Sequence, residues 1–464
     1  MIALIGLELA ILRRDRRAFG SLVALGLLIL VAFFANAAAN LQADQAKAQV
    51  AAAERARWVG QGEKDPHSAA HYSIFAFKPS PALAALDPGA EPFVGQSVWL
   101  EAHHQNDMLY RPQQNASALQ RAAFANPAAL LTGFAPLVVF LLAFTLVAQD
   151  RERGGLRLAL GAATAPARLV VARAAAVWSA AGVTLIAPVA LAAVAWTAAQ
   201  GRLDADVMLR LLSWTVIIAT YLAVVALAAV LVCLKAASPR LALAALFGAW
   251  IAFALVAPRV LDGAAGALAP LPSTQSVKQE IARQAPAFWS DEQNAKNRKA
   301  LMARYGVDRY EDIPNPRMAE LDLMERHSHA VFDRVLGDFY RQVATQDDLF
   351  ARLSLASPAA AAQALSAAAA GSDFSHHRHF IDSAERYRRD LVNAMNADGM
   401  AHSAHGAERH LNDETLWSAI PPFAYAAPAL GERSAVPLPA LLALLAWLAA
   451  ILAALQLTAR SLKP

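Results

Sequence analysis

Six long apolar stretches constrain the fold of this chain more than any other feature of its sequence. They occupy residues 21–38, 128–148, 169–198, 209–234, 241–261 and 438–457. A helix of about 20 apolar residues spans the hydrocarbon core of a bilayer. Only 17% of the residues are charged, whereas an average soluble protein has about 25%. We therefore predict a mainly α, polytopic membrane protein with six transmembrane helices.

The third and fourth stretches are longer than a bilayer requires, so we expect them to tilt, bend or protrude. Pro188 interrupts the third stretch, and proline is a common cause of helix kinks. The first stretch has some likeness to a signal peptide. Its apolar run exceeds a typical signal core, and residues 36–40 form only a weak cleavage-like site. We expect it to remain as an anchor.

The basic residues of the short loops predict their side of the membrane, because cytoplasmic loops are rich in Lys and Arg. Four clusters lie beside the apolar stretches: Arg13, Arg14, Arg16 and Arg17; Arg151, Arg153, Arg157 and Arg168; Lys235 and Arg240; and Arg460 and Lys463. With six spans, all four clusters fall on one side. We therefore expect both termini, the loops 149–168 and 235–240 and the tail 458–464 to be cytoplasmic.

Residues 39–127 and 262–437 then form two extracytoplasmic domains, with a short outer loop at 199–208. The first domain opens with a helix-like run, residues 41–58, that extends the first span outward. Prolines and glycines punctuate the rest of it, which is typical of loops with short strands. We expect this first domain to be mixed α/β.

The second outer domain is expected to be mostly helical, with helices near residues 318–344 and 379–395. The Ala-rich run 357–370 also favours a helix, because Pro358 follows Ser357 in the manner of a first helical residue. This run is too short for a seventh span. The single cysteine, Cys233, excludes an intrachain disulfide, and we expect it to be a small buried residue rather than a redox or metal thiol.

The loop between the second and third stretches is the most informative short segment. It leaves the second stretch with dense mixed charge, breaks at Gly154 and Gly155, and resumes as a short amphipathic helix. A short helix along the cytoplasmic face can transmit a push from a soluble partner into two spans. A solvated loop that only satisfies the positive-inside pattern is the alternative interpretation.

This loop resembles the segment that joins the second and third spans of ABC-2-type permeases. Glu152, Gly154, Gly155 and Leu156 carry the resemblance, although Arg153 and Gly155 replace the usual Glu and Thr. Residues 7–15 are similar to the amphipathic elbow helix that precedes the first span in that family. The resemblance implies that residues 1–20 form a cytoplasmic elbow helix. Its predicted functional residues are Glu8, Arg13, Arg14, Arg16 and Arg17. The resemblance also implies contacts to an ATPase through Glu152 to Arg157.

A narrower resemblance, to a bacterial branch of these permeases with large periplasmic insertions after the first and fifth spans, covers most of the chain. It rests on residues 72–79, 86–89, 98–106, 355–358, 370–373 and 380–391. The resemblance implies a type-2 ABC exporter-like fold in the bacterial inner membrane, with two ATPase subunits and a second permease, either an identical copy or a paralogue. ATP and magnesium would bind to the ATPase, because this chain has no phosphate-binding loop motif and needs no cofactor of its own.

All 12 histidines lie in the two outer segments. The spacings of His376, His377 and His379, of His402 and His405, and of His67 and His71 could suit a metal. They could equally be ordinary loop histidines. A second polar run, containing Glu101, His103, His104 and Asn106, could line a ligand surface or could satisfy polar groups at the junction of the two outer domains.

Other classes of function are less compatible with the sequence. The net charge of +4 is too small to indicate nucleic acid binding. Arg173, Arg210 and Arg259 are expected to reach the membrane interface, and the absence of mid-membrane Asp, Glu or His argues against an ion-coupled carrier. Protease motifs are also absent from the sequence, so we expect no enzyme. Two alternatives to export stay open: a membrane-anchored scaffold that binds a periplasmic partner, and ABC-driven uptake of a metal chelate.

Overall fold

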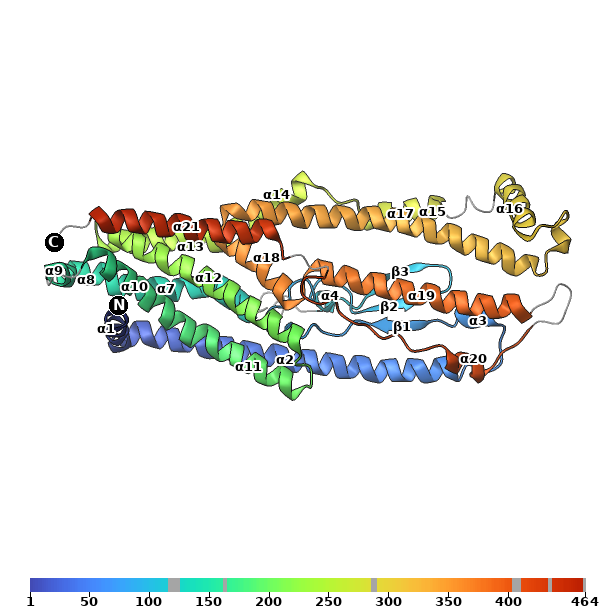
Figure 1. Cartoon of the computed structure of the whole chain (residues 1–464), viewed down its shortest axis with the longest axis horizontal. Coiled ribbons are helices and arrows are strands. Elements are labelled where there is room, and N and C mark those ends of the chain that lie inside the picture. Colours follow the sequence, from blue (N-terminus) through green and yellow to red (C-terminus); the bar gives the residue numbers. More distant parts are fainter. Residues whose placement is uncertain (116–125, 162–164, 285–289, 403–409, 433–435, 462–464) are drawn as a thin grey trace.

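The computed structural model describes residues 1–115, 126–161, 165–284, 290–402, 410–432 and 436–461. The molecule is elongated and mainly helical, as predicted. Both termini lie at the same end of the long axis (Figure 1), which we call the terminal end. The opposite, distal end holds the small sheet and the long helices of the outer segments.

Six helices are long and apolar enough to cross a membrane, so the chain has the features of a multi-pass membrane protein. We call them spans 1 to 6: Arg16–Val59, Pro127–Glu152, Pro166–Ala199, Ala205–Lys235, Pro239–Leu268 and Leu438–Ser461. Each contains one of the predicted apolar stretches. Span 1 is the continuous helix α2 (Arg16–Val59), so the predicted extension over residues 41–58 belongs to the same helix as the first apolar stretch.

Spans 4 and 6 are the single helices α12 (Ala205–Lys235) and α21 (Leu438–Ser461). Spans 2, 3 and 5 are divided by π-helical turns. The α-helical parts of these three are α6 (Pro127–Ala129), α7 (Ala135–Ala143) and α8 (Asp150–Glu152), α10 (Pro166–Ala181) and α11 (Ala187–Ala199), and α13 (Pro239–Trp250) and α14 (Ala257–Leu268).

Three of the four π-helical turns in the described residues have a shared cause in the sequence, whereas the fourth, Phe144–Gln149, is not followed by a proline. An Ala-Pro pair, with Pro136, Pro188 or Pro258, directly follows the turns Leu130–Phe134, Gly182–Ile186 and Ile251–Val256. Proline has no backbone N–H, so a carbonyl in the preceding turn loses its intrahelical partner. At Pro188, where we expected a kink, the helix is interrupted by a π-helical turn. The same arrangement of turn and proline recurs in spans 2 and 5.

Neighbouring helices meet the carbonyls of these turns, as the interior of a membrane protein requires. The Tyr221 hydroxyl donates to Thr132 O (2.7 Å), and Trp250 Nε1 donates to Gly133 O (2.7 Å). At the second turn, a side chain on Gly26 of span 1 would lie 2.8 Å from Thr184 O. The π-helical turns are therefore places where spans pack closely.

The outer segments combine a small sheet with long helices. An antiparallel sheet has the order β1 (Ile74–Phe77), β2 (Ser97–Leu100) and β3 (Gln105–Leu109). The helices of the outer segments are α3 (Pro66–Ala70), α4 (Pro112–Asn115), α15 (Thr274–Gln284), α16 (Asp291–Tyr305), α17 (Pro316–Leu353), α18 (Pro358–Ala370), α19 (Phe374–His402) and α20 (Glu414–Ala419). The mixed character of the first segment and the helical character of the second thus appear in the structure.

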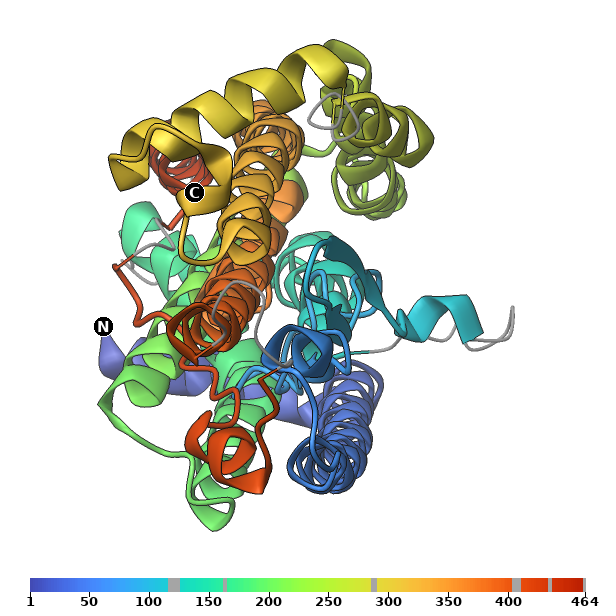
Figure 2. The same cartoon turned by 90° about the vertical axis from the view of Figure 1, so that its right-hand side faces the viewer.

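The two outer segments, expected as separate domains, share one hydrophobic core. Trp58 at the end of α2 and Trp417 of α20 are fully buried and pack edge to face. Sheet residues such as Val98 and residues of α19 such as Phe380 belong to the same cluster. Seen along the long axis (Figure 2), α19 lies between α2 and the outer part of α17. The segments therefore form one packed unit.

Helix α18 differs from its expected place in the outer domain, because it packs among the spans. It contacts α12 and α21 and belongs to the core of the bundle. Figure 1 shows it beside these helices. Ser357 accepts a hydrogen bond from Ala360 N, as a helix N-cap does, and its hydroxyl donates to Phe253 O of span 5 (2.7 Å). The small alanine side chains allow this close packing. The sequence did not predict this position, because α18 is too short to be recognised as a span.

Candidate functional sites

At the terminal end, a short first helix meets the loop between spans 2 and 3. Helix α1 (Ile2–Arg14) is separated from α2 by Asp15, whose backbone is extended. The Asp15 carboxylate accepts hydrogen bonds from Arg17 N and Ala18 N, both at 3.0 Å, and so caps α2. The chain can therefore turn sharply between α1 and span 1.

Arg173 of span 3 holds this end together. It donates to Asp150 Oδ2 at the end of span 2 (2.5 Å) and pairs with Glu8 Oε1 of α1 at 3.4 Å. The Arg173 side chain is only 4% exposed. Burial raises the pKa of Glu8, and the guanidinium acts in the opposite direction. The expectation that Arg173 reaches the membrane interface is wrong, because its guanidinium is buried inside the protein and paired there with Glu8 and Asp150.

The loop is also attached to span 4. Arg151 donates to Leu234 O at 2.7 Å and to Ala236 O, which are carbonyls at the end of α12. A side chain at Gly155 would meet the Asp150 carboxylate at 2.0 Å, so the glycine leaves room for the Asp150–Arg173 pair. The loop therefore contacts span 3 through Asp150 and span 4 through Arg151, and Arg173 links it to Glu8 of α1. Neither Asp150 nor Arg151 was among the predicted coupling residues.

The predicted ATPase-coupling residues divide between the two faces of this loop, and the prediction is wrong for Leu156, whose side chain is buried and not open to a partner. Helix α9 (Gly155–Gly161) buries Leu156 and Leu160 against the bundle core. The charged members of the predicted set are exposed: Glu152, Arg153 and Arg157. Leu158 is 77% exposed beside them. Gly154, at φ +82°, separates α8 from α9. The four elbow arginines of the predicted set are also exposed: Arg13, Arg14, Arg16 and Arg17.

At the other end of the spans, Arg210 of span 4 is buried and paired, which corrects its expected position at the interface. Its Nε lies 2.6 Å from Asp206 Oδ2, and its Nη2 donates to Pro428 O (2.7 Å). The Asp206 carboxylate also accepts from Leu430 N (2.6 Å). Arg210 thus attaches the segment before span 6 to span 4. Arg259 donates to Leu255 O and is exposed.

Two motifs that carry the narrower family resemblance, residues 86–89 and 370–373, meet directly. Ser372 Oγ donates to Asp87 O (2.8 Å), and Ala90 N donates to Ser372 O (2.8 Å). Ser366 Oγ of α18 donates to Asp87 Oδ2 (2.5 Å). Burial raises the pKa of Asp87. This interlock joins the first outer segment to α18, and through α18 to the spans.

The three histidines predicted as metal ligands near the start of α19 do not converge. His376 Nδ1 lies 2.5 Å from Asp373 Oδ1, and His379 Nδ1 lies 3.1 Å from the Tyr425 hydroxyl. His377 is buried beside Lys78, and burial lowers its pKa to about 3. Consecutive residues of a helix point about 100° apart, so the rings of His376 and His377 point in different directions. His405 lies outside the described residues.

The second predicted set lies at the junction of the two outer segments. Arg388 of α19 donates to Ala102 O (2.7 Å) and to Glu101 O, and Asn106 Nδ2 donates to Trp99 O (3.0 Å). These contacts favour the structural alternative for the run. His104 is exposed, whereas His103 faces α17 and α3. Burial lowers the pKa of His103 to about 4, so its imidazole is neutral near pH 7.

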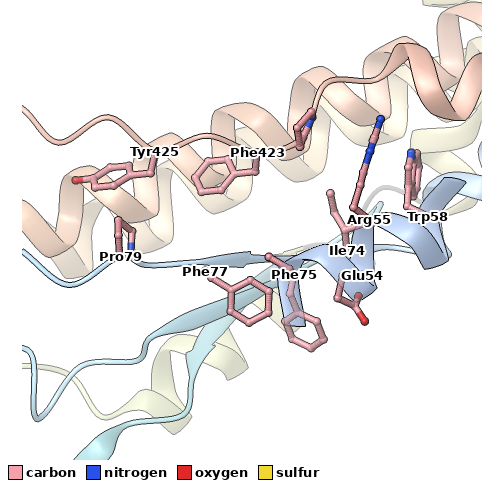
Figure 3. Close-up of a pocket in the computed structure, with 11 residues that line it drawn as sticks. Glu54, Arg55, Trp58, Ile74, Phe75, Phe77, Pro79, Phe423 and Tyr425 are labelled. Carbon is pink, nitrogen blue, oxygen red and sulfur yellow. The ribbon is translucent and has the colours of Figure 1, made fainter. Parts of the chain in front are cut away.

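An aromatic pocket of about 220 Å³ lies between α2, β1 and the chain that follows α20. Trp58, Phe75 and Phe423 are among its lining residues, and Arg55 and Glu54 are among its polar ones (Figure 3). Both outer segments contribute to it. This pocket was not predicted, because its walls come from segments more than 340 positions apart in the sequence.

Comparison with known proteins identifies one region of similarity. Residues 276–426 match a family model described as a domain of unknown function, DUF3526. This region begins in α15 and ends after α20, so it covers most of the second outer segment, including α18 and α19. No curated protein and no solved structure matches the chain.

Proposed function

We propose that this protein is the permease subunit of an ABC transporter of the ABC-2 type. In this proposal a separate ATPase drives export or extrusion of a substrate across the bacterial inner membrane. The observation that carries the proposal is the exposed loop of Glu152, Arg153, Arg157 and Leu158. Its buried side is attached to the bundle, whereas its exposed side offers charge and one large apolar side chain. Protein interfaces commonly combine an apolar centre with a polar, charged rim.

The contacts of the loop indicate how a push would spread. Asp150 and Arg173 link the end of span 2 to span 3 and, through Glu8, to α1. Arg151 links the loop to the end of span 4. A displacement of α9 would therefore act on three spans and the elbow helix together. A loop that only satisfied the positive-inside pattern would not require these buried pairs.

At the distal side, α18 is suited to carry movement of the spans into the outer unit. Trp214 Nε1 of span 4 donates to Ser366 Oγ (2.9 Å), and Trp447 Nε1 of span 6 donates to Leu355 O (2.9 Å). Ser366 in turn contacts Asp87 of the first outer segment. We propose that closure of the ATPase moves the spans, and that α18 passes this movement to the periplasmic unit.

Glu152→Ala combined with Arg153→Ala tests the proposal. The permease and its ATPase would be purified together, and complex-stimulated ATP hydrolysis would be measured in lipid nanodiscs. We expect the stimulation to fall about tenfold, which corresponds to about 1.4 kcal/mol of lost coupling. Because both side chains are exposed, the stability of the permease should stay unchanged.

The matched control is Arg309→Ala with Glu311→Ala, an exposed acid–base pair near the end of α16 at the distal end. This variant should retain full stimulation. Unchanged stimulation in the Glu152/Arg153 variant, or no ATPase in the purified complex, would contradict the proposal. The second result would favour a membrane-anchored scaffold.

A further inference from the structure

Three histidines that are separate in the sequence come together at the junction of the outer segments. His67 and His71 lie on and directly after α3, and His103 lies in the connection between β2 and β3. Their ligand atoms all lie within 4.8 Å of one another. The two Nε2 atoms of His67 and His71 are 3.1 Å apart. At a tetrahedral zinc ion with Zn–N distances of about 2.0–2.1 Å, ligand nitrogens lie roughly 3.4 Å apart.

A carboxylate of the second outer segment, which is a further possible donor, lies beside His103. Glu325 of α17 is only 3% exposed, and its Oε1 lies 3.6 Å from His103 Nδ1. Within the described residues, neither of these two buried atoms has a hydrogen-bond partner. A buried polar atom without a partner is costly, so both atoms are suited to bind a further group placed between them.

Asn396 of α19 orients two of the four donors. Its Oδ1 lies 3.2 Å from His67 Nδ1, and its Nδ2 donates to Glu325 Oε2 at 2.6 Å. His67 can therefore donate its Nδ1 hydrogen to Asn396 and direct Nε2 toward His71. A hydrogen bond from the outer nitrogen of a metal-binding histidine commonly fixes the ring in this manner.

We propose that His67, His71, His103 and Glu325 form a binding site for a divalent transition-metal ion, with zinc as the best match. Three imidazoles and one carboxylate are donors that zinc prefers in four-coordinate sites. Magnesium and calcium prefer oxygen donors, so the donor set disfavours them. The exposed His71 gives the ion a route from solvent.

The site would connect the two outer segments. Three of its donors belong to the first segment, and Glu325 belongs to the second, within the region that matches the DUF3526 model. Bound metal would therefore hold α17 against α3 and the sheet. This inference is independent of the proposed transport function, since metal binding is measurable without ATPase.

The test uses the full chain purified in detergent and freed of metal with a chelator. Zinc affinity would be measured by competition with a chromophoric chelator, and cobalt would report the geometry through its visible absorption. We expect zinc binding, a tetrahedral cobalt spectrum and a zinc-dependent rise in unfolding temperature. His71→Ala should weaken zinc binding by more than roughly 100-fold, and Asn396→Ala by roughly 10- to 100-fold.

His402→Ala provides the control, because Asp398, His402 and His410 form a second cluster of possible ligands near the end of α19. This variant should keep the high-affinity site. Because His71 is exposed, its substitution should leave the metal-free unfolding temperature unchanged, and His67→Ala gives a second test of the same loss. The inference is overturned if the wild-type chain binds no zinc, or if His71→Ala and His67→Ala both bind zinc as the wild type does. It is also overturned if only His402→Ala loses zinc binding.

Discussion

Gly89 lies where the two outer segments interlock, and the atoms around it leave no room for a side chain. Its φ is +47°, and a Cβ there would lie 2.5 Å from Ser372 O. Gly89→Ala would add a steric clash to the cost of a left-handed backbone, which is about 1–3 kcal/mol by itself. We expect destabilisation of about 3 kcal/mol, measured as a lower unfolding temperature of the detergent-solubilised protein.

Gly62→Ala is the matched control. Gly62 also has a positive φ, +76°, but no atom lies within 4 Å of its hypothetical Cβ. This variant should lose only the backbone contribution, about 1–2 kcal/mol. Equal unfolding temperatures for the two variants would show that the contact with Ser372 does not hold the segments together.

Individual side chains were the least predictable part of the candidate sites. The sequence predicted that Arg173 and Arg210 lie near opposite ends of the bundle of spans. It did not predict that both are buried or which residues they pair with. Glu8 is 165 positions from Arg173, and Pro428 is 218 positions from Arg210. Such pairs depend on which helices become neighbours, and a single sequence carries no direct signal of that. The spacing of His67 and His71 indicated that these two could share a ligand, but their meeting with His103 was not predictable for the same reason.

At the scale of elements, the π-helical turns of the spans depend on contacts from neighbouring helices. Regular α-helical geometry pairs the N–H of residue 136 with Thr132 O, but Pro136 has no N–H. Tyr221 replaces that donor through its hydroxyl, which is buried in the bundle. Tyr221→Phe would leave Thr132 O without this partner. We expect a loss of about 1 kcal/mol of stability, measured by thermal unfolding in detergent.

Pro136→Ala separates this explanation from a general packing effect. It restores an N–H that can return to Thr132 O, so Tyr221→Phe should cost less in the Pro136→Ala background than in the wild type. A double-mutant cycle measures this coupling. If the two substitutions are strictly additive, Tyr221 does not compensate for the proline.

The sequence predicted the elements better than it predicted their packing. The length of the apolar stretches located all six candidate spans, and Pro- and Gly-rich punctuation indicated short strands in the first outer segment. Helix α18 was also expected, from Ser357 and Pro358 at its start. Its place inside the bundle was not, because 13 residues are too few to cross a membrane and alanine gives no clear amphipathic pattern. Repetition of the Ala-Pro pair was an available signal for the π-helical turns.

At the scale of the whole molecule, the proposed function requires the terminal and distal ends to lie on opposite sides of the membrane. The described residues of the four basic clusters gather near the terminal end, where both termini lie, as expected for a cytoplasmic face. Cysteine labelling can test this orientation, because the single native cysteine, Cys233, is fully buried. Arg153→Cys and Lys299→Cys would each add one thiol at an exposed position, in the loop before α9 and in α16 respectively.

In intact spheroplasts, a membrane-impermeant maleimide should label the Lys299→Cys protein and leave the Arg153→Cys protein unlabelled. After detergent permeabilisation both should react, whereas the wild type should stay nearly unreactive because Cys233 is buried. Labelling of Arg153→Cys from outside would show that α9 faces the outside of the cell, where no cytoplasmic ATP is present. An ATPase could then not reach the loop formed by Glu152, Arg153 and Leu158, and the contacts of Asp150 and Arg151 would have to be explained by stability alone.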